Sequence, residues 1–388
     1  MNAALRGWCP DLFAPMQSGD GWLVRLKPRL ARLTAAQGRL IAGQAACHGN
    51  GIIELTGRGN LQLRGLTPAS AELLARFAVE AGLADPEPAV ERRRNILLSP
   101  LAGDVARGLA LELEGLLATD DALSALPGKF GFAIDDDDPL RLHDAAADIV
   151  LRAVDGGWQV GAAFGADPVR CNAQDAPGVA LALAHDWIRS GATERPSHGH
   201  GADEGAGRQA IGPLPALHAF GIGLPFGQTD AATLDRLCGL AGQFGDGILH
   251  TTPWRAVVLS GIAPEDAGAL RAAATGLTAR LIVEPDDPGR LVSACVGRPG
   301  CASGSVDARA DARSLLDGGA LLRAGVRAAS LHVSGCAKGC AHPGPAAITL
   351  VGSAGRYGLV RAGRASDTAD VDGLTLAEVA RQLEHDRS

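Results

Sequence analysis

Aromatic residues and long apolar runs are both scarce in this sequence of 388 residues. Phe, Trp and Tyr make up 4% of it, whereas apolar residues of all kinds reach 46%, so the cores must be filled largely by Leu, Val, Ile and Ala. No stretch approaches the roughly 18 apolar residues of a membrane-spanning helix, and the N-terminal segment lacks the continuous apolar core of a signal peptide. We therefore expect a cytoplasmic protein without a membrane partner.

An excess of positive charge is also absent. Asp and Glu number 43 against 36 Lys and Arg, which gives a formal net charge of −7. Because nucleic-acid-binding proteins present a basic surface, this balance argues against a nucleic-acid partner. Any anion site must be a local cluster of Arg and Lys. The chain is also too long for one ordinary core, so we expect about two to four domains.

The eight cysteines need a reason, because disulfides are rare in the cytoplasm. Metal binding, catalysis and simple burial are the alternatives. Four cysteines are scattered, and two of these, Cys47 and Cys238, lie in apolar helical patterns that favour buried structural thiols. The other four form two close pairs in the C-terminal half of the chain, Cys295 with Cys301 and Cys336 with Cys340.

The spacing of these pairs favours an iron–sulfur cluster. They follow the pattern C-x5-C, 34 intervening residues and C-x3-C, within turns rich in Gly and Pro. Structural zinc sites favour tighter knuckles on both sides, whereas four thiolates from two such turns suit the corner irons of a 4Fe–4S cluster. Nearby glycines let backbone amides approach the sulfurs. Zinc and unrelated structural thiols are the alternatives.

The chain contains an internal repeat. Residues 35–66 align without gaps on residues 231–262, and both copies predict an amphipathic helix, a G-x-G turn and two strands. Thr56 falls on Thr252 in this alignment. Chance similarity of helix–turn–strand units is the alternative, but a match without gaps favours duplication. Residues 191–215, rich in Gly, Pro and Ala, predict a flexible linker between the two halves.

Polar side chains follow one another at alternate positions in the first copy of the repeat, at Arg58, Asn60, Gln62 and Arg64. In an extended segment this alternation puts them on one face of a sheet. A solvated strand face would give the same pattern. The glycines on both sides of Arg58, together with the basic run RRRN at 92–95, favour an anion site, because Arg and Asn suit bidentate contacts with carboxylates.

These motifs resemble those of sulfite and nitrite reductases. The cysteine pattern and its flank GC-x-x-GC-x-x-P-x-x-A-x-x-x-LVG are similar to their cluster motif. In addition, T-x-R with Arg58, RN with Arg94 and Asn95, and LP-x-KF with Lys129 are similar to motifs whose basic residues face sirohaem and its bound oxyanion in those enzymes.

The resemblance implies an α+β fold with the duplicated architecture of the sulfite and nitrite reductases. Two ferredoxin-like half domains and two larger α+β domains are implied, and the second larger domain would bind the 4Fe–4S cluster. The implied ranges are 15–84 and 216–280 for the half domains, 85–190 and 281–388 for the larger domains, and 191–215 for the linker.

One position departs from the reductases, which carry a second Lys two residues after the first in LP-x-KF, where this chain has Gly131. The segments SGDGWLVRLKP, LPGKFGFAID and TPWR, with the cysteine motif, look more like the precorrin-3B synthase family of aerobic cobalamin biosynthesis. That resemblance implies a carboxylate-rich tetrapyrrole as substrate. Its implied binding residues are Arg58, Asn60, Gln62, Arg64, Arg94, Lys129 and Arg255.

The activity implied by this resemblance is an oxygen-dependent monooxygenase that hydroxylates precorrin-3A with γ-lactone formation. It further implies a 4Fe–4S cluster on the paired cysteines, a mononuclear non-haem iron, and NADH-derived electrons from a reductase partner. No 2-His-1-carboxylate spacing identifies the iron site. His143 and Asp144 are candidate ligands, although an ordinary exposed loop explains them as well, so the catalytic residues stay unassigned.

Two other functions compete with this one. The first is a sirohaem-dependent sulfite or nitrite reductase, in which Cys340 would bridge the cluster and the haem. The second is a non-catalytic protein that carries electrons on the cluster or carries a tetrapyrrole. Gly131 and the short chain favour the monooxygenase over the reductase.

Overall fold

The computed structural model describes residues 10–142, 147–165, 167–193, 204–277, 280–318 and 330–385. Its strands form four sheets of five strands each, and helices pack against them. The expected α+β class is therefore confirmed. No helix in the described ranges is long and apolar enough to cross a membrane.

Two of the sheets belong to the duplicated units. The first copy has strands β1 (Met16–Ser18), β2 (Gly21–Leu26), β4 (Ile52–Leu55) and β5 (Leu61–Leu66), with helices α1 (Ala35–His48) and α2 (Pro68–Glu80). The second copy has strands β11 (Gly212–Leu214), β12 (Ala219–Gly223), β14 (Ile248–Thr251) and β15 (Ala256–Ser260), with helices α7 (Ala231–Phe244) and α8 (Ala267–Thr275). The short helix α6 (Glu204–Gln209) precedes β11.

The two copies exchange a strand. The strand β3 (Arg32–Thr34), from the first half of the chain, pairs with β14, and β13 (Gln228–Asp230), from the second half, pairs with β4. The resulting strand orders are β1-β2-β5-β4-β13 and β11-β12-β15-β14-β3. Each sheet is thus completed by the other copy.

Helices α1 and α7 start in equivalent ways and pack closely against each other. The side chain of Thr34 accepts a hydrogen bond from the third residue of α1, and Asp230 does the same for α7, so each helix has an N-cap. A Cβ added at Gly38 in α1 would collide with Sγ of Cys238 in α7, so the two helices contact closely there. Cys238 is buried, as expected, whereas the expectation that Cys47 is buried is wrong, because it lies on the exposed side of α1.

The other two sheets also match each other. The first contains β6 (Ile96–Leu98), β7 (Phe132–Asp135), β8 (Ile149–Val154), β9 (Gly157–Ala162) and β10 (Val169–Cys171), with α3 (Pro88–Arg93), α4 (Asp104–Thr119) and α5 (Ala176–Arg189). The second contains β16 (Val292–Ala294), β17 (Leu331–Ser334), β18 (Ala346–Ser353), β19 (Arg356–Gly363) and β20 (Val371–Leu374), with α9 (Ala308–Asp317) and α11 (Leu376–His385).

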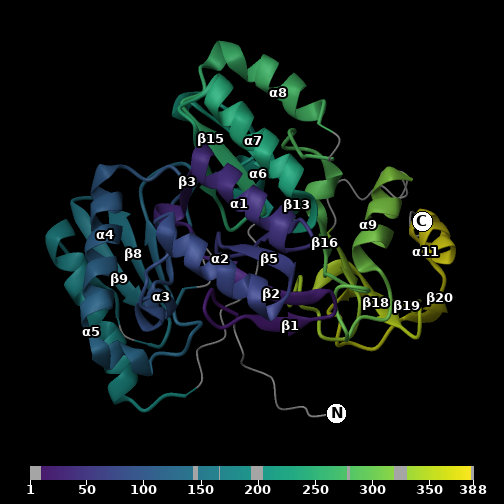
Figure 1. The fold of residues 1–388 in the computed structure, drawn as a ribbon. Coiled ribbons are helices and arrows are strands. Elements are labelled where there is room, and N and C mark those ends of the chain that lie inside the picture. The colour runs from purple at the N-terminus through teal and green to yellow at the C-terminus, as the bar shows by residue number, and fades with distance from the viewer. Residues whose placement is uncertain are drawn as a thin grey trace.

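Both larger sheets pair their strands in the same way. The first three strands are parallel and the last two are antiparallel, in the orders β6-β7-β8-β9-β10 and β16-β17-β18-β19-β20. Every residue of β7 and β17 is buried, as is usual for a strand inside a parallel sheet covered on both faces. Figure 1 shows the first half domain, with α1 and α2, between the other three units.

Candidate functional site

The four paired cysteines lie in loops at one edge of the second large sheet. Cys295 directly follows β16, and Cys336 comes two residues after the end of β17. Because these neighbouring strands are parallel, their carboxyl ends meet at the same edge. The backbone amide of Gly335 donates a hydrogen bond of 3.0 Å to Sγ of Cys295. Two loops that are far apart in the sequence, one after each strand, therefore meet at this edge of the sheet.

The four thiols also lie within electrostatic reach of one another. Burial raises the pKa of Cys340, and negative charge on Cys295, Cys336 and Cys301 raises it further, while Lys338 lowers it. The four cysteines are all free thiols. This convergence of sulfur donors, with an amide already directed at one of them, fits a 4Fe–4S cluster. Among the described residues, no three His, Cys, Asp or Glu side chains come together in a way that could hold a single metal ion.

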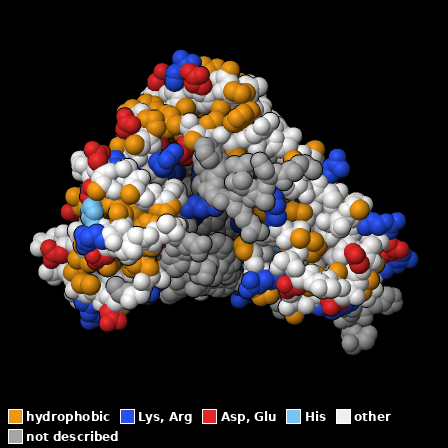
Figure 2. Space-filling model, turned by 90° about the horizontal axis from the view of Figure 1, so that it is seen from below, with side chains coloured by type: hydrophobic (Ala, Val, Ile, Leu, Met, Phe, Trp, Pro, Cys, Tyr) orange, Lys and Arg blue, Asp and Glu red, His pale blue; other side chains and the backbone are white. Residues whose placement is uncertain are grey.

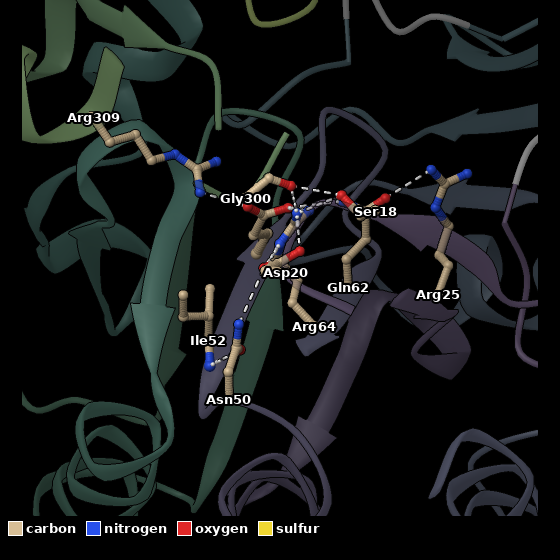
Figure 3. A network of polar contacts seen from close by, with 10 residues as sticks. Ser18, Asp20, Arg25, Asn50, Ile52, Gln62, Arg64, Gly300 and Arg309 are labelled. Atoms are coloured by element: carbon tan, nitrogen blue, oxygen red, sulfur yellow. Dashed lines mark hydrogen bonds and ion pairs between the residues drawn. The ribbon is translucent and has the colours of Figure 1, made fainter. Parts of the chain in front are cut away.

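Arg64 connects the first half domain to the loop that carries Cys301, as Figure 3 shows. Its side chain is 3% exposed and forms ion pairs with Asp20 and Glu54. Its Nη2 donates a hydrogen bond of 2.9 Å to the carbonyl of Gly300, which also accepts from Oγ of Ser18. The partners of the Arg64 guanidinium are therefore all groups of the protein itself.

Gln62 belongs to the same network. Its Nε2 donates to Glu54, and its Oε1 accepts from Arg25. Gln62 and Arg64 share one face of β5, as the alternation predicts. Arg58 and Asn60 do not lie on that strand, because β5 begins at Leu61. Gly59 has a φ of +68°, which ends the extended segment, so the expectation of four side chains on one strand face is wrong.

The turn that holds Arg58 and Asn60 is built around Thr56. The hydroxyl of Thr56 accepts hydrogen bonds from the amides of both residues. Nη1 of Arg58 donates a hydrogen bond of 2.7 Å to the carbonyl of Lys129, whose side chain is exposed. These contacts place the turn beside the segment that leads into β7.

A small pocket lies between this turn and the start of β7. It brings together two residues of the reductase-like motifs, Arg58 and Asn95, with an apolar wall. It is lined by Arg58, Asn60, Asn95, Ile96, Leu97, Gly131, Phe132 and Ala147. Figure 2 shows Lys and Arg side chains at several points around the centre of the face that it displays. The pocket therefore combines hydrogen-bond donors with apolar surface, as small-molecule sites usually do.

Gly131 lies just before β7 rather than inside a strand. Its amide donates a hydrogen bond of 2.8 Å to the buried side chain of Asp148. A Cβ at this position would lie 3.3 Å from the carbonyl oxygen of Asn95 and 3.5 Å from Nη1 of Arg58. Gly131 is therefore not inside a strand, and neighbouring groups lie close to the space that a side chain would occupy.

Arg94 is 5% exposed and lies inside the first large unit. It forms an ion pair with Glu91, which is 1% exposed, and donates to the carbonyls of Lys27 and Leu83. Asn95 follows it and donates from Nδ2 to the carbonyls of Gly128 and Phe130. Of the pair RN, only Asn95 reaches the pocket.

Arg255 occupies the turn of the second copy that corresponds to Arg58 and its neighbours. Its guanidinium donates to the carbonyls of Val292 and Ala341 and to Oγ of Ser293, next to the cysteine segments.

The structure thus divides the predicted residues into three groups. Arg58, Asn60 and Lys129 lie at or beside the pocket, Arg64 and Arg255 contact the cysteine segments, and Gln62 and Arg94 lie in internal networks.

His332 lies close to the second cysteine pair in the sequence but is not among the residues that the sequence motifs predict for the site. It is fully buried in β17, neither ring nitrogen has a hydrogen-bond partner, and its ring stacks edge-on against that of His342. Burial, followed by His342 and Arg255, lowers its pKa to about 4. Its place four residues before Cys336 is the sequence feature that could have indicated a role near the cysteines. His143 and Asp144 lie outside the described residues.

Comparisons with known proteins agree with this architecture. Residues 14–81 and 215–276 each match the nitrite/sulfite reductase ferredoxin-like half domain. The fold follows that of the NirA protein of Mycobacterium tuberculosis with a TM-score of 0.68, over 94% of this chain and 79% of that chain, at 17% sequence identity. These matches define the chain as a protein of the sulfite and nitrite reductase fold.

Sequence similarity places the chain more narrowly. It is 34% identical to a precorrin-3B synthase of Sinorhizobium sp. across 93% of this chain and 84% of that protein. It is 30% identical to the ferredoxin–nitrite reductase of Leptolyngbya laminosa, but across only 33% of this chain. The chain therefore belongs to the precorrin-3B synthase family, which is a family of oxidoreductases.

Proposed function

We propose that this protein is a precorrin-3B synthase that uses dioxygen to hydroxylate precorrin-3A. The hydroxyl enters at the meso carbon between rings D and A, and the acetate of ring A closes a γ-lactone. One atom of dioxygen enters the product and the other leaves as water, which requires two electrons and two protons. NADH is the proposed source of the electrons, which a separate reductase delivers.

The observation that carries this proposal is the pocket at Gly131. Arg58 and Asn60 place hydrogen-bond donors at its edge, and Lys129 adds a cation beside it. A charge-assisted hydrogen bond to a carboxylate is stronger than a neutral one, so these groups suit the carboxylates of a tetrapyrrole. Gly131 adds no side chain to the pocket, and the half-buried Ile96 contributes apolar surface beside these donors.

The proposed cofactor ligands are Cys295, Cys301, Cys336 and Cys340. When bound there, a 4Fe–4S cluster supplies one-electron transfer. A mononuclear non-haem iron is proposed as a further cofactor, and no ligands are assigned to it. The residues of this chain hold the sulfurs in place and bind the substrate carboxylates.

An isotope experiment tests the proposal. Protein purified without oxygen is given precorrin-3A, reductant and oxygen-18 gas. We expect one labelled oxygen in the tetrapyrrole product and no oxidation of reduced methyl viologen by sulfite. An absorption spectrum recorded beforehand should show the broad cluster band without the sharp bands of sirohaem. Sulfite-dependent turnover together with an unlabelled tetrapyrrole would instead establish the reductase.

A further inference from the structure

The two copies of the duplicated turn differ at one position that matters for backbone conformation. The hydroxyl of Thr252 accepts from the amides of Trp254 and Ala256, just as Thr56 does in the first copy. Gly59 in the first copy has a φ of +68°, and Arg255 at the same place in the second copy has a φ of +59°. Glycine adopts this left-handed conformation without strain, whereas arginine does not.

A non-glycine residue keeps this conformation where its surroundings compensate for the strain, and the side-chain contacts of Arg255 provide such compensation. Nη1 donates a hydrogen bond of 3.1 Å to the carbonyl of Val292, and Nη2 donates 2.8 Å to Oγ of Ser293 and 3.3 Å to the carbonyl of Ala341. Ser293 lies two residues before Cys295, and Ala341 directly follows Cys340. One guanidinium therefore joins both cysteine segments to the second half domain.

The same side chain brings a fixed positive charge to the two segments that carry the cysteines. Burial, followed by the charge of Arg309, lowers the pKa of Arg255 to about 10, which leaves it protonated at neutral pH. A positive charge beside the segments that hold a cluster favours its reduced, more negative state and so raises its reduction potential. Both Nη atoms already have protein partners, so the guanidinium is not presented to the pocket of Arg58.

We propose that Arg255 is a positioning residue for the iron–sulfur cluster, fixing the β16 segment before Cys295 against the loop after Cys340. This inference rests on the proposed cluster. Arg64 holds the remaining loop from the other side, because its contact with Gly300 lies next to Cys301. Each half domain thus contributes one arginine to the cysteine segments.

The test compares Arg255→Gly and Arg255→Lys with the unchanged holoprotein. Glycine suits the backbone, so Arg255→Gly should fold with an unchanged circular dichroism spectrum and isolate the loss of the side chain. Lysine keeps the charge but cannot span three oxygens. Arg93→Lys is the matched control, because Arg93 is also buried and donates to two carbonyls, those of Asp120 and Ala118, away from the cysteines.

We expect iron retained against a chelator to fall about tenfold or more in Arg255→Gly, as for other outer partners of metal ligands. The potential of the cluster, followed by its electron paramagnetic resonance signal, should fall in Arg255→Gly and be partly restored in Arg255→Lys. Arg93→Lys should change neither. Wild-type retention and potential in both Arg255 variants would overturn the inference, as would loss of tetrapyrrole binding with an unchanged cluster.

The proposed function fails in a different and recognisable way. If the unchanged protein, purified without oxygen, contains no iron and sulfide, then the proposed cluster is absent and the role of Arg255 falls with it. If the unchanged protein contains the cluster and the Arg255 variants behave like it, only the positioning role is rejected. Should Arg255→Gly fail to fold, Arg255→Lys decides by the same two measurements.

Discussion

The backbone amide of Gly335 donates a 3.0 Å hydrogen bond to Sγ of Cys295. An equivalent hydrogen bond is present in the first large unit, where the amide of Asp136 donates to Oγ of Ser99 at 3.0 Å. Ser99 directly follows β6 as Cys295 follows β16. Both units therefore share one loop–loop contact, and only the second carries sulfur there. The proposed cluster site therefore includes a contact that the first large unit makes with a hydroxyl in place of a thiol.

Cysteine replacement gives the most direct test of that site. Cys336→Ser should lose the cluster or hold it poorly, because a hydroxyl is a harder and weaker ligand for iron than a thiolate. The unchanged protein should contain about four iron ions per chain, measured together with acid-labile sulfide. Cys171→Ser, at a distant cysteine at the end of β10, should match the unchanged protein. Full iron content in Cys336→Ser would refute the assignment.

Arg58→Ala should weaken substrate binding without affecting the cluster. We expect the free energy of binding to fall by about 1.5–3 kcal/mol, the range for a hydrogen bond to a charged group. Titration of the purified protein with the tetrapyrrole, followed by fluorescence or absorption, measures the change. Iron content serves as the internal control. Unaltered affinity would show that the pocket at Gly131 does not bind the carboxylates.

Arg94→Ala should act on stability instead. Removing the guanidinium leaves the carboxylate of Glu91 buried without its partner, which costs about 3–5 kcal/mol. Urea unfolding measures the loss. Arg92→Ala is the matched control, since the Arg92 side chain is 58% exposed and pairs with Asp11 at 3.7 Å. A similar small effect of both replacements would argue that Arg94 does not stabilise the fold.

Gly131→Lys should reduce turnover while the protein stays folded. The backbone of Gly131 lies outside the left-handed region, so a side chain causes no backbone strain, but its Cβ would press on Asn95 and its ammonium would approach Arg58. We expect turnover to fall by about tenfold or more, equivalent to at least ~1.4 kcal/mol. Gly131→Ala, with a single methyl group, should fall less. Equal turnover in all three proteins would remove Gly131 from the site.

His250 should make stability depend on pH. Burial, followed by the charge of Arg32, lowers its pKa to about 4 from 6.5. The unfolded chain therefore binds a proton that the folded protein does not between these values, so stability is complete above pH 6.5 and falls toward pH 4. The full loss is about 3 kcal/mol. Because His332 also has a pKa lowered to about 4, His250→Gln should reduce the fall in urea-unfolding stability across that window without abolishing it, and an unchanged slope would contradict the assignment.

The sequence predicted the fold well because the determining signals are local. Helix and strand periods, and the register of Thr56 on Thr252, lie within short stretches. The convergence of the cysteines also follows from two loops that end neighbouring strands. The exchange of β3 and β13 has no such signal, because it depends on which edge of a sheet is left unpaired.

The basic residues were harder to predict, because their roles depend on partners that are remote in the sequence. Arg64 and Arg94 look like binding residues until Asp20, Glu54 and Glu91 are placed beside them. Alternation also suggested that Arg58 and Arg64 share a face, and a single left-handed glycine separates them. Burial of the carboxylate partners decides which arginine can meet a substrate, and the alternating pattern does not reveal that burial.

The exchanged strands bear on how this chain arose. An ancestor with one unit of each kind would have lacked the fifth strand of its ferredoxin-like sheet. Two copies would have had to supply that strand to each other, so such an ancestor would have been a strand-swapped homodimer with twofold symmetry. Identical subunits must carry identical residues at equivalent places. In a fused chain, by contrast, one copy can have Ser99 where the other has Cys295, so a cluster site can be present in one unit alone.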